Sequence, residues 1–166
     1  KAAHFITPND SSWSNTTMAW SCIGYNQKIS PIQMLTFHNA IANNGKMVKP
    51  TLYKGETEVI NQQIASKANI DSLQEALVKV VTEGLGKPAQ SEKVQVAGVS
   101  GSSQISTEED NSEGKVNTIY SVEFCGYFPA DEPKYSIIVS MNKIGLPASG
   151  NLMAGRVFKD IVESIK

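Results

Sequence analysis

Apolar residues recur at helical spacing between residues 32 and 41, and the flanking residues match the two ends of a helix. At the start, Ser30 can cap the free backbone amides, Pro31 suits the first helical position, and Gln33 can complete a capping box with Ser30. At the other end, Gly45 suits the left-handed conformation that often closes a helix. The pattern therefore predicts a helix that begins after Ser30 and ends before Gly45.

Two further helices are predicted from the same spacing. One begins near Asp71 or Ser72, because Ser72 with Glu75 fits a capping box, and it ends before Gly84. Its expected buried stripe consists of Leu73, Ala76, Leu77, Val80 and Val81. The other runs from about Met153 to the end of the chain. Its expected stripe consists of Val157, Phe158, Ile161, Val162 and Ile165.

Alternation of apolar and polar residues predicts strands in the second half of the chain. It is clearest in residues 121–128, and it returns in residues 135–141 after a turn that contains Asp131 and Pro133. Residues 94–97 predict a further strand that leads into a run of small residues. Between the two helices of the first half, we expect an extended piece and a polar connection.

Two segments have no regular pattern. Residues 1–29 are rich in Ser, Asn and Thr, and we interpret them as an irregular lead-in that lies over another part of the molecule. Residues 106–118 are acidic and polar, with Val116 as their one apolar residue, so we predict a solvated, mobile loop there.

The order of these elements is helix, extended piece, helix, three strands and helix. Consecutive strands joined by short connections pair antiparallel most simply. A three-stranded sheet needs at least one covered face, and the terminal helix can cover it. The expected class is therefore α+β, with an antiparallel sheet of about three strands covered by helices, in a single partial domain over residues 1–166.

Composition and charge exclude several classes of function. The chain has 166 residues, of which 40% are hydrophobic and 19% charged, which is typical of a folded domain. Its formal net charge of -1 gives no electrostatic case for nucleic acid or an anionic membrane. No apolar run approaches the roughly 20 residues of a spanning helix. No signal peptide is visible, and because the chain starts at Lys1 and not with Met, we expect it to be an excised piece of a longer parent.

Cysteine and histidine residues give no sign of a metal site. The chain has two cysteines, Cys22 and Cys125, which are too few for a disulfide scaffold or a cysteine-based zinc site. Two alternatives remain for them: a single disulfide bond between the two, or two small, semi-buried thiols. His4 and His38 are far apart, and His38 is expected to be a packed or surface residue. No metal or cofactor is expected.

Several segments, in the order in which they occur, match one known family. Residues 23–27, Ile-Gly-Tyr-Asn-Gln, lead into the Ser-Pro-Ile-Gln helix that ends with Ala-Asn-Asn-Gly. Residues 96–104, Val-Ala-Gly-Val-Ser-Gly-Ser-Ser-Gln, precede Phe-Cys-Gly-Tyr-Phe-Pro-Ala-Asp at residues 124–131, and Ala154-Gly155-x-Val157-Phe158 lies in the last helix. From about Ile23 to its end, the chain thus resembles the C-terminal part of the transpeptidase domain of class B penicillin-binding proteins.

This resemblance implies the serine β-lactamase/penicillin-binding fold, in which a sheet carries helices on both sides and an active-site groove follows one edge strand. The family's motifs are Ser-x-x-Lys, Ser-x-Asn and Lys-Thr-Gly, and its serine needs the lysine as a base. Here Ser-x-x-Lys occurs at residues 112–115 and 140–143, and Ser-x-Asn at 140–142 and 149–151. None has the family's position, so we interpret them as chance matches and expect no catalytic residue in this chain.

The third motif is present in a degenerate form. Val99 stands where the family has lysine, whereas Ser100, Gly101 and Ser102 keep the hydroxyls and the small residue of Thr-Gly-Thr. Together with Ser103, which replaces a usual alanine, these residues are expected from the resemblance to bind the substrate. One lost charge-assisted hydrogen bond costs about 1.5–3 kcal/mol, or roughly tenfold to several hundredfold in affinity or rate.

The resemblance implies a fragment of a peptidoglycan D,D-transpeptidase that is inactive alone. Its parent would bind D-Ala-D-Ala stem peptides or β-lactams outside the cytoplasm and be anchored in the inner membrane. A transpeptidase-like pseudoenzyme that binds cell-wall or division proteins is the alternative that Val99 favours. A penicillin-sensing or β-lactamase-like relative is a third, which the Ser-Pro-x-Gln helix disfavours. We also expect the missing N-terminal part of the domain as a partner, and a dimer that covers exposed apolar surface when the fragment is alone.

Overall fold

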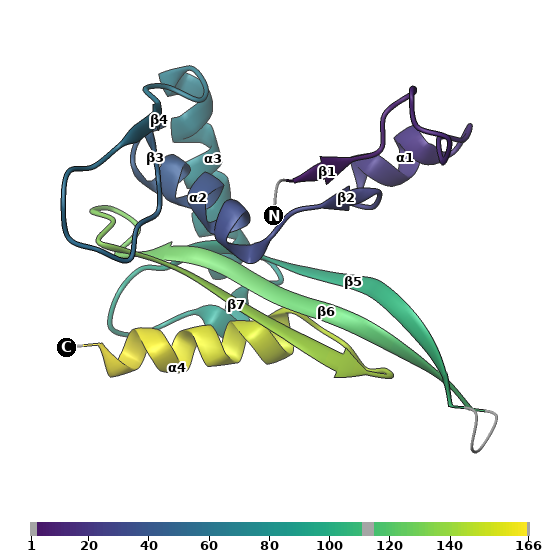
Figure 1. Cartoon of the computed structure of the whole chain (residues 1–166). Helices are drawn as coiled ribbons and strands as arrows, with labels where there is room; N and C mark the ends of the chain where they lie inside the picture. Colours follow the sequence, from purple (N-terminus) through teal and green to yellow (C-terminus); the bar gives the residue numbers. More distant parts are fainter. Residues whose placement is uncertain (1–2, 111–114, 166) are drawn as a thin grey trace.

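The computed structural model describes residues 3–110 and 115–165, and a three-stranded antiparallel sheet with helices on both faces forms its centre (Figure 1). This confirms the predicted α+β class. In chain order the elements are β1 (His4–Phe5), α1 (Thr17–Cys22), β2 (Gln27–Lys28), α2 (Pro31–Ala42), β3 (Met47–Val48), β4 (Val59–Asn61), α3 (Lys67–Thr82), the 3-10 turn η1 (Lys87–Ala89), β5 (Ala97–Asp110), β6 (Lys115–Phe128), β7 (Tyr135–Ile144), the π-helical turn η2 (Asn151–Gly155) and α4 (Arg156–Ser164).

The sheet has the order β5-β6-β7, so β6 is its central strand and β5 and β7 are its edges within the described residues. The ladder between β5 and β6 continues to the pair Asp110 and Lys115. The prediction of a loop over residues 106–118 was therefore wrong for 106–110 and 115–118, while residues 111–114 lie outside the described part. Backbone hydrogen bonds extend a ladder whatever the side chains are, whereas alternation reveals only strands that bury one face.

Successive side chains of β6 point to opposite faces of the sheet, and each face has its own helical cover. On one face, Phe124 and Phe128 pack with Phe158 and Val162 of α4, which confirms the terminal helix as a cover. On the other face, a second cluster forms around the central Tyr127. It consists of Ile41 and Ala42 of α2, Leu77 of α3, Ala97 of β5 and Tyr127 itself.

Helix α2 begins as predicted from the sequence. Gln33 Oε1 accepts hydrogen bonds from the backbone N–H and from Oγ of Ser30, both at 2.9 Å. The helix ends at Ala42, before Gly45 as predicted, and Gly45 is left-handed with φ of 93° and donates its N–H to the Ala40 carbonyl at 2.7 Å. Asn44 is left-handed as well, with φ of 53°. This pattern satisfies a carbonyl that the last turn would otherwise leave without a partner.

Helix α3 begins at Lys67, earlier than the predicted Asp71 or Ser72. Ser66 caps it by accepting a hydrogen bond from the Asn69 N–H at 3.3 Å, and the hydroxyl of Ser72 donates to the Ala68 carbonyl instead. The predicted buried stripe is confirmed for Leu77 and Val81 and is wrong for Leu73. The buried residues of α3 are Ile70, Leu77 and Val81, whereas Leu73 is 42% exposed.

The lead-in, residues 3–29, is not wholly irregular. Strands β1 and β2 pair antiparallel, with His4 opposite Lys28 and Phe5 opposite Gln27, and the short helix α1 lies between them in the chain. Trp20 of α1 meets Tyr25 edge to face, with ring centroids 5.2 Å apart. The lead-in therefore forms a small unit of its own, on the same side of the sheet as α2 (Figure 1).

Candidate substrate-binding groove

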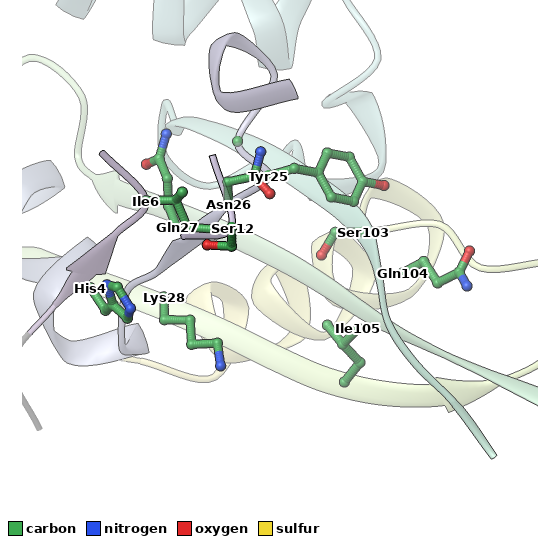
Figure 2. A pocket seen from close by; sticks show the side chains of 11 residues that line it. His4, Ile6, Ser12, Tyr25, Asn26, Gln27, Lys28, Ser103, Gln104 and Ile105 are labelled. Carbon is green, nitrogen blue, oxygen red and sulfur yellow. The ribbon is translucent and has the colours of Figure 1, made fainter. Parts of the chain in front are cut away.

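A groove lies between the lead-in and the part of the sheet that α2 and α3 do not cover. It consists of two overlapping cavities of about 480 Å³ and 700 Å³, which is within the usual size of small-molecule and peptide sites. Both cavities are lined by His4, Gly24, Gln27, Lys28, Ser103 and Ile105. In Figure 2, the side chains of His4 and Lys28 lie across the cavity from Ser103 and Ile105 of β5.

The lead-in wall of the groove is held by backbone and side-chain hydrogen bonds. Asn26 adopts a left-handed conformation with φ of 61°, and its side-chain amide donates to the Thr17 carbonyl at 3.2 Å. Gln27 donates its side-chain amide to the Ser21 carbonyl at 3.0 Å. These bonds attach the turn before β2 to α1, so the wall has a defined shape although few of its residues are in regular elements.

The strand β5 brings Ser103, one of the residues predicted to bind substrate, into the groove. By alternation, Val99 and Gly101 lie on the same face of the strand as Ser103, and Val99 is 37% exposed. Next to Gly101 there is open space, because a Cβ placed there would meet no heavy atom within 4 Å. The motif therefore presents a valine, a glycine and a serine to the groove side.

The other two predicted residues, Ser100 and Ser102, lie on the opposite face by the same alternation. The Ser102 hydroxyl accepts a hydrogen bond from the Gly150 N–H at 2.8 Å. Gly150 is close to the sheet there, and a Cβ at this position would meet the carbonyl oxygens of Gly101 and Glu123. Ser102 thus attaches the turn before α4 to β5. A substrate-binding role for Ser100, Gly101, Ser102 and Ser103 stays a prediction.

Glu123 is a groove residue that the sequence interpretation did not single out. It lines the larger cavity together with Ser121, and it pairs with Gly101 in the ladder. Its Oε1 accepts hydrogen bonds from the hydroxyls of Ser121 at 3.1 Å and Ser140 at 2.8 Å. The signal was available: alternation along β6 puts this carboxylate on the same face as Cys125 and Tyr127.

The remaining wall of the larger cavity comes from the start of α2. Ser30, Gln33 and Met34 line it. Because Gln33 is held by Ser30, the polar groups of this wall are positioned by the same bonds that begin the helix. The groove is therefore bounded by the lead-in, α2, β5 and β6.

The two cysteines are free within the described residues, Cys22 exposed and Cys125 buried, so the bridge left open by the sequence does not form. Burial, and then the neighbouring Glu123 carboxylate, raise the pKa of the Cys125 thiol to about 12. A thiol with so high a pKa stays protonated near neutral pH, and the thiolate is the nucleophile. Cys125 is therefore a packing residue rather than a reactive one.

His38 is packed, which is one of the two alternatives that the sequence left open for it. It lies on the buried side of α2, and burial lowers the pKa of its imidazole. Among the described residues, no group of three or more His, Cys, Asp or Glu side chains is placed to hold a metal ion. In that same part of the chain, no helix is long and apolar enough to cross a bilayer.

The fold and the groove together define an α+β domain with a polar cleft beside an edge strand. Comparison with known proteins identifies the family. Residues 5–163 match the penicillin-binding protein transpeptidase domain, and the chain belongs to this family.

Curated relatives agree with this assignment. The chain is 25% identical over 158 residues to stage V sporulation protein D of Bacillus subtilis, and 29% identical over 115 residues to penicillin-binding protein 3 of the same organism. These alignments cover 81% and 66% of this chain. They cover only 24% and 17% of the two relatives, so the chain spans a quarter or less of their length.

Solved structures agree in fold. The transpeptidase domain of the FtsI4 D,D-transpeptidase from Legionella pneumophila superposes with a TM-score of 0.66 at 25% identity, over 93% of this chain and 55% of that one. The crystal structure of a protein described as a putative peptidoglycan glycosyltransferase from Atopobium parvulum gives a TM-score of 0.71 at 24% identity, over 91% of this chain and 36% of that one. The expected transpeptidase fold is confirmed.

Proposed function

We propose that this chain is the C-terminal part of a class B penicillin-binding transpeptidase domain, and that its groove recognises the D-Ala-D-Ala end of a peptidoglycan stem peptide or a β-lactam. The observation that carries the proposal is the groove beside the edge strand β5, with Ser103 of the degenerate Lys-Thr-Gly motif in its lining. The outer edge of β5 pairs with no other strand among the described residues, so an extended peptide can add to it through backbone hydrogen bonds.

In this proposal the chain binds and does not attack. A serine nucleophile needs an adjacent base, and within the described residues no Ser-x-x-Lys match begins a helix. The match at residues 140–143 lies within β7, and the other one ends where β6 begins. Gly101 and Ser103 would contact the ligand, and Ser100 and Ser102 would support the strand from its other face. The proposed place of action is outside the cytoplasm, where peptidoglycan is built, in a parent anchored in the inner membrane.

The test is binding of a peptide that ends in D-Ala-D-Ala, measured by calorimetry against the same peptide ending in L-Ala-L-Ala. We expect the D-peptide to bind at least tenfold more tightly, because stereochemistry decides whether the terminal carboxylate can reach the motif. The Val99→Lys variant is expected to bind more tightly by roughly tenfold or more, because it restores a cation. Equal affinity for the two peptides, or no binding at millimolar concentration, overturns the proposal.

Val99 also supports a second function, a transpeptidase-like pseudoenzyme that serves as an interaction module for cell-wall or division proteins. Fluorescent penicillin separates the two. A longer protein that contains this chain is expected to become labelled on a denaturing gel if it is an enzyme. If neither that protein nor its Val99→Lys variant is labelled, the pseudoenzyme is the better description; labelling of the variant alone shows that Val99 silences a complete site.

The proposed partners include the N-terminal part of the same domain, because large apolar side chains of the lead-in are exposed. Met18, Trp20 and Ile23 are 67%, 50% and 68% exposed. We expect the isolated chain to form dimers or bind a hydrophobic dye through such surface. If light scattering shows a monodisperse monomer and the fluorescence of the hydrophobic dye does not increase, the result argues against this partner.

A further inference from the structure

A third cavity, of about 440 Å³, adjoins the groove and is called the aromatic pocket below. Its lining consists of Trp20, Tyr25, Asn26, Gln104 and Ile105. All of these residues except Trp20 also line the 480 Å³ cavity, so the aromatic pocket continues the groove along β5. In Figure 2, the side chains of Tyr25 and Gln104 lie at the end of that cavity away from His4.

Trp20 and Tyr25 form a corner of two aromatic surfaces in this pocket. Their rings meet edge to face, with centroids 5.2 Å apart and planes at 79° to each other. The N–H of Tyr25 donates to the Trp20 carbonyl at 3.0 Å, and Asn26 attaches the same turn to α1 through its bond to the Thr17 carbonyl. The corner is therefore preformed, which lowers the cost of ordering the site when a ligand binds.

The chemistry of the lining indicates a neutral ligand. None of the five residues carries a formal charge, whereas the larger cavity of the groove includes Lys28 and Glu123. The face of an aromatic ring is electron-rich and attracts weakly positive C–H groups. Beside the rings, the Tyr25 hydroxyl and the Trp20 indole N–H can form hydrogen bonds with hydroxyl groups. A saccharide ring matches this combination, because it has faces of C–H groups, a rim of hydroxyls and no charge.

An apolar peptide side chain matches the pocket less well. It would cover the two rings, but it offers nothing to the amide oxygen of Asn26, whose nitrogen is already bonded to the Thr17 carbonyl. A polar atom that loses water without gaining a partner costs free energy. The hydroxyls of a saccharide can donate to such an oxygen.

The position of the pocket along β5 suits a saccharide that is joined to a stem peptide. Gly101 and Ile105 are four residues apart, which is about 13 Å of extended strand. In the proposed function, the D-Ala-D-Ala end lies at Gly101 and Ser103, and peptidoglycan carries its glycan at the opposite end of the stem peptide. About four residues of extended peptide span the distance from the motif to the pocket.

We propose that the aromatic pocket is a saccharide-binding subsite, in which Trp20 and Tyr25 stack against a neutral sugar ring of the peptidoglycan glycan. The origin of the sugar rests on the proposed function, whereas the preference for a neutral saccharide rests on the lining alone. Met18 and Ile23 are exposed and do not line the pocket, so they remain available to the N-terminal part of the domain.

Tryptophan fluorescence tests the contact directly, because the chain has two tryptophans and Trp13 does not line the pocket. The probe is N-acetylchitotetraose, a neutral glycan without a peptide. In Trp13→Phe, the probe should shift the emission of Trp20 to shorter wavelength and saturate at millimolar concentration, because the sugar displaces water from the ring. In Trp20→Phe, in which Trp13 alone emits, no shift is expected.

Substitutions of Tyr25 in the Trp13→Phe background measure the role of the corner. Tyr25→Ala should weaken glycan binding about tenfold, and Tyr25→Phe, which keeps the ring, by less than about threefold. Tyr53→Ala is the matched control, because Tyr53 is 83% exposed and does not line the pocket, so the affinity should not change. The emission shift in Trp13→Phe decides the matter even if Tyr25→Ala does not fold.

Two further ligands test the class of ligand and its origin. N-acetylphenylalaninamide, which imitates an apolar peptide side chain, should bind at least tenfold more weakly than the glycan. A stem peptide that ends in D-Ala-D-Ala and carries a sugar should bind about tenfold more tightly than the bare peptide. Tyr25→Ala should remove that difference.

The outcomes separate this inference from the proposed function. No shift of Trp20 emission with the glycan, an equal affinity in Tyr25→Ala, or tighter binding of N-acetylphenylalaninamide overturns the saccharide subsite. In each case, a retained preference for D-Ala-D-Ala over L-Ala-L-Ala leaves the proposed function standing. Conversely, glycan binding at Trp20 without any preference for D-residues overturns the proposed function and keeps the saccharide subsite. If neither glycan nor peptide binds, both are overturned.

Discussion

On one face of β6, Phe124 and Phe128 lie against Phe158 of α4, and none of the three is more than 3% exposed. On the other face, the same strand passes from the buried Tyr127 to the half-buried Glu123, which borders the groove. The first face excludes water along its whole packed length, whereas the second does so only where α2 and α3 cover it. One strand thus contributes both to stability, through apolar burial, and to a polar site that remains open to a ligand.

Replacing Phe158 by alanine should break the packed face and produce the largest effect. The ring is fully buried and lies 4.9 Å from Phe124 and 6.1 Å from Phe128 between centroids. Its removal leaves a cavity, so the free energy of unfolding should fall by about 3–5 kcal/mol in urea titrations. Val157→Ala, at a 39% exposed neighbour in α4, is the control and should cost less than about 1 kcal/mol. Equal losses in the two variants would contradict the comparison.

Alkaline pH should weaken the face that Tyr127 and Cys125 share. Burial raises the pKa of the Cys125 thiol from 9.0 to about 12 and that of the Tyr127 hydroxyl from 10.0 to about 12. Both groups are neutral in the fold and ionise more easily in the unfolded chain, so their contribution is complete below pH 9 and is lost as the pH rises toward 12.

The expected loss of unfolding free energy is a few kcal/mol, measured by denaturant titrations at a series of pH values. The Cys125→Ala variant should show a shallower decline between pH 9 and pH 12, because only Tyr127 then remains. A free energy of unfolding that stays constant from pH 9 to pH 11 in the unchanged protein would show that these groups are not buried as described.

Substitutions of Ser102 and Ser103, which lie on opposite faces of β5, compare the two faces of the sheet through a smaller change in stability. Ser102→Ala removes the acceptor of the Gly150 N–H, so the free energy of unfolding should fall by about 1–2 kcal/mol. Ser103→Ala, on the groove side, should change stability by no more than about 0.5 kcal/mol and should instead weaken binding of the D-Ala-D-Ala peptide. Calorimetry and urea titration on both variants check this. If Ser103→Ala proves the more destabilising of the two, the assignment of faces along β5 is wrong.

Local signals in the sequence predicted much of the fold. The start of α2 follows from Ser30 and Gln33, whose hydrogen bonds involve residues three positions apart. The start of α3 was misjudged, because Ser72 with Glu75 offers the same signal as a true start, whereas the helix is capped by Ser66 and already buries Ile70. The strand extension over residues 106–110 was missed, because polar segments paired through their backbones show no alternation of apolar and polar residues.

The candidate site was predictable only in part. The family motif located the strand that contains Ser103, since its residues are contiguous in the chain. Lys28 and Glu123 were not assigned to the site, because they are almost a hundred positions apart and each has an ordinary sequence context. The relation between them becomes visible once the lead-in is placed over the sheet.

By itself, the sequence determined the α+β class, the order of the main helices and strands after the lead-in, the cap of α2 and the resemblance that the family match confirms. These properties depend on residue types and on contacts within a few positions, which a linear pattern contains. Only the tertiary structure decided the register between β5 and β6, which face of β5 each serine occupies, and the meeting of Lys28, Ser103 and Glu123 around one groove. These depend on how separate elements pack, and the burial of Phe124, Phe128 and Phe158 leaves Glu123 on the face that borders the groove.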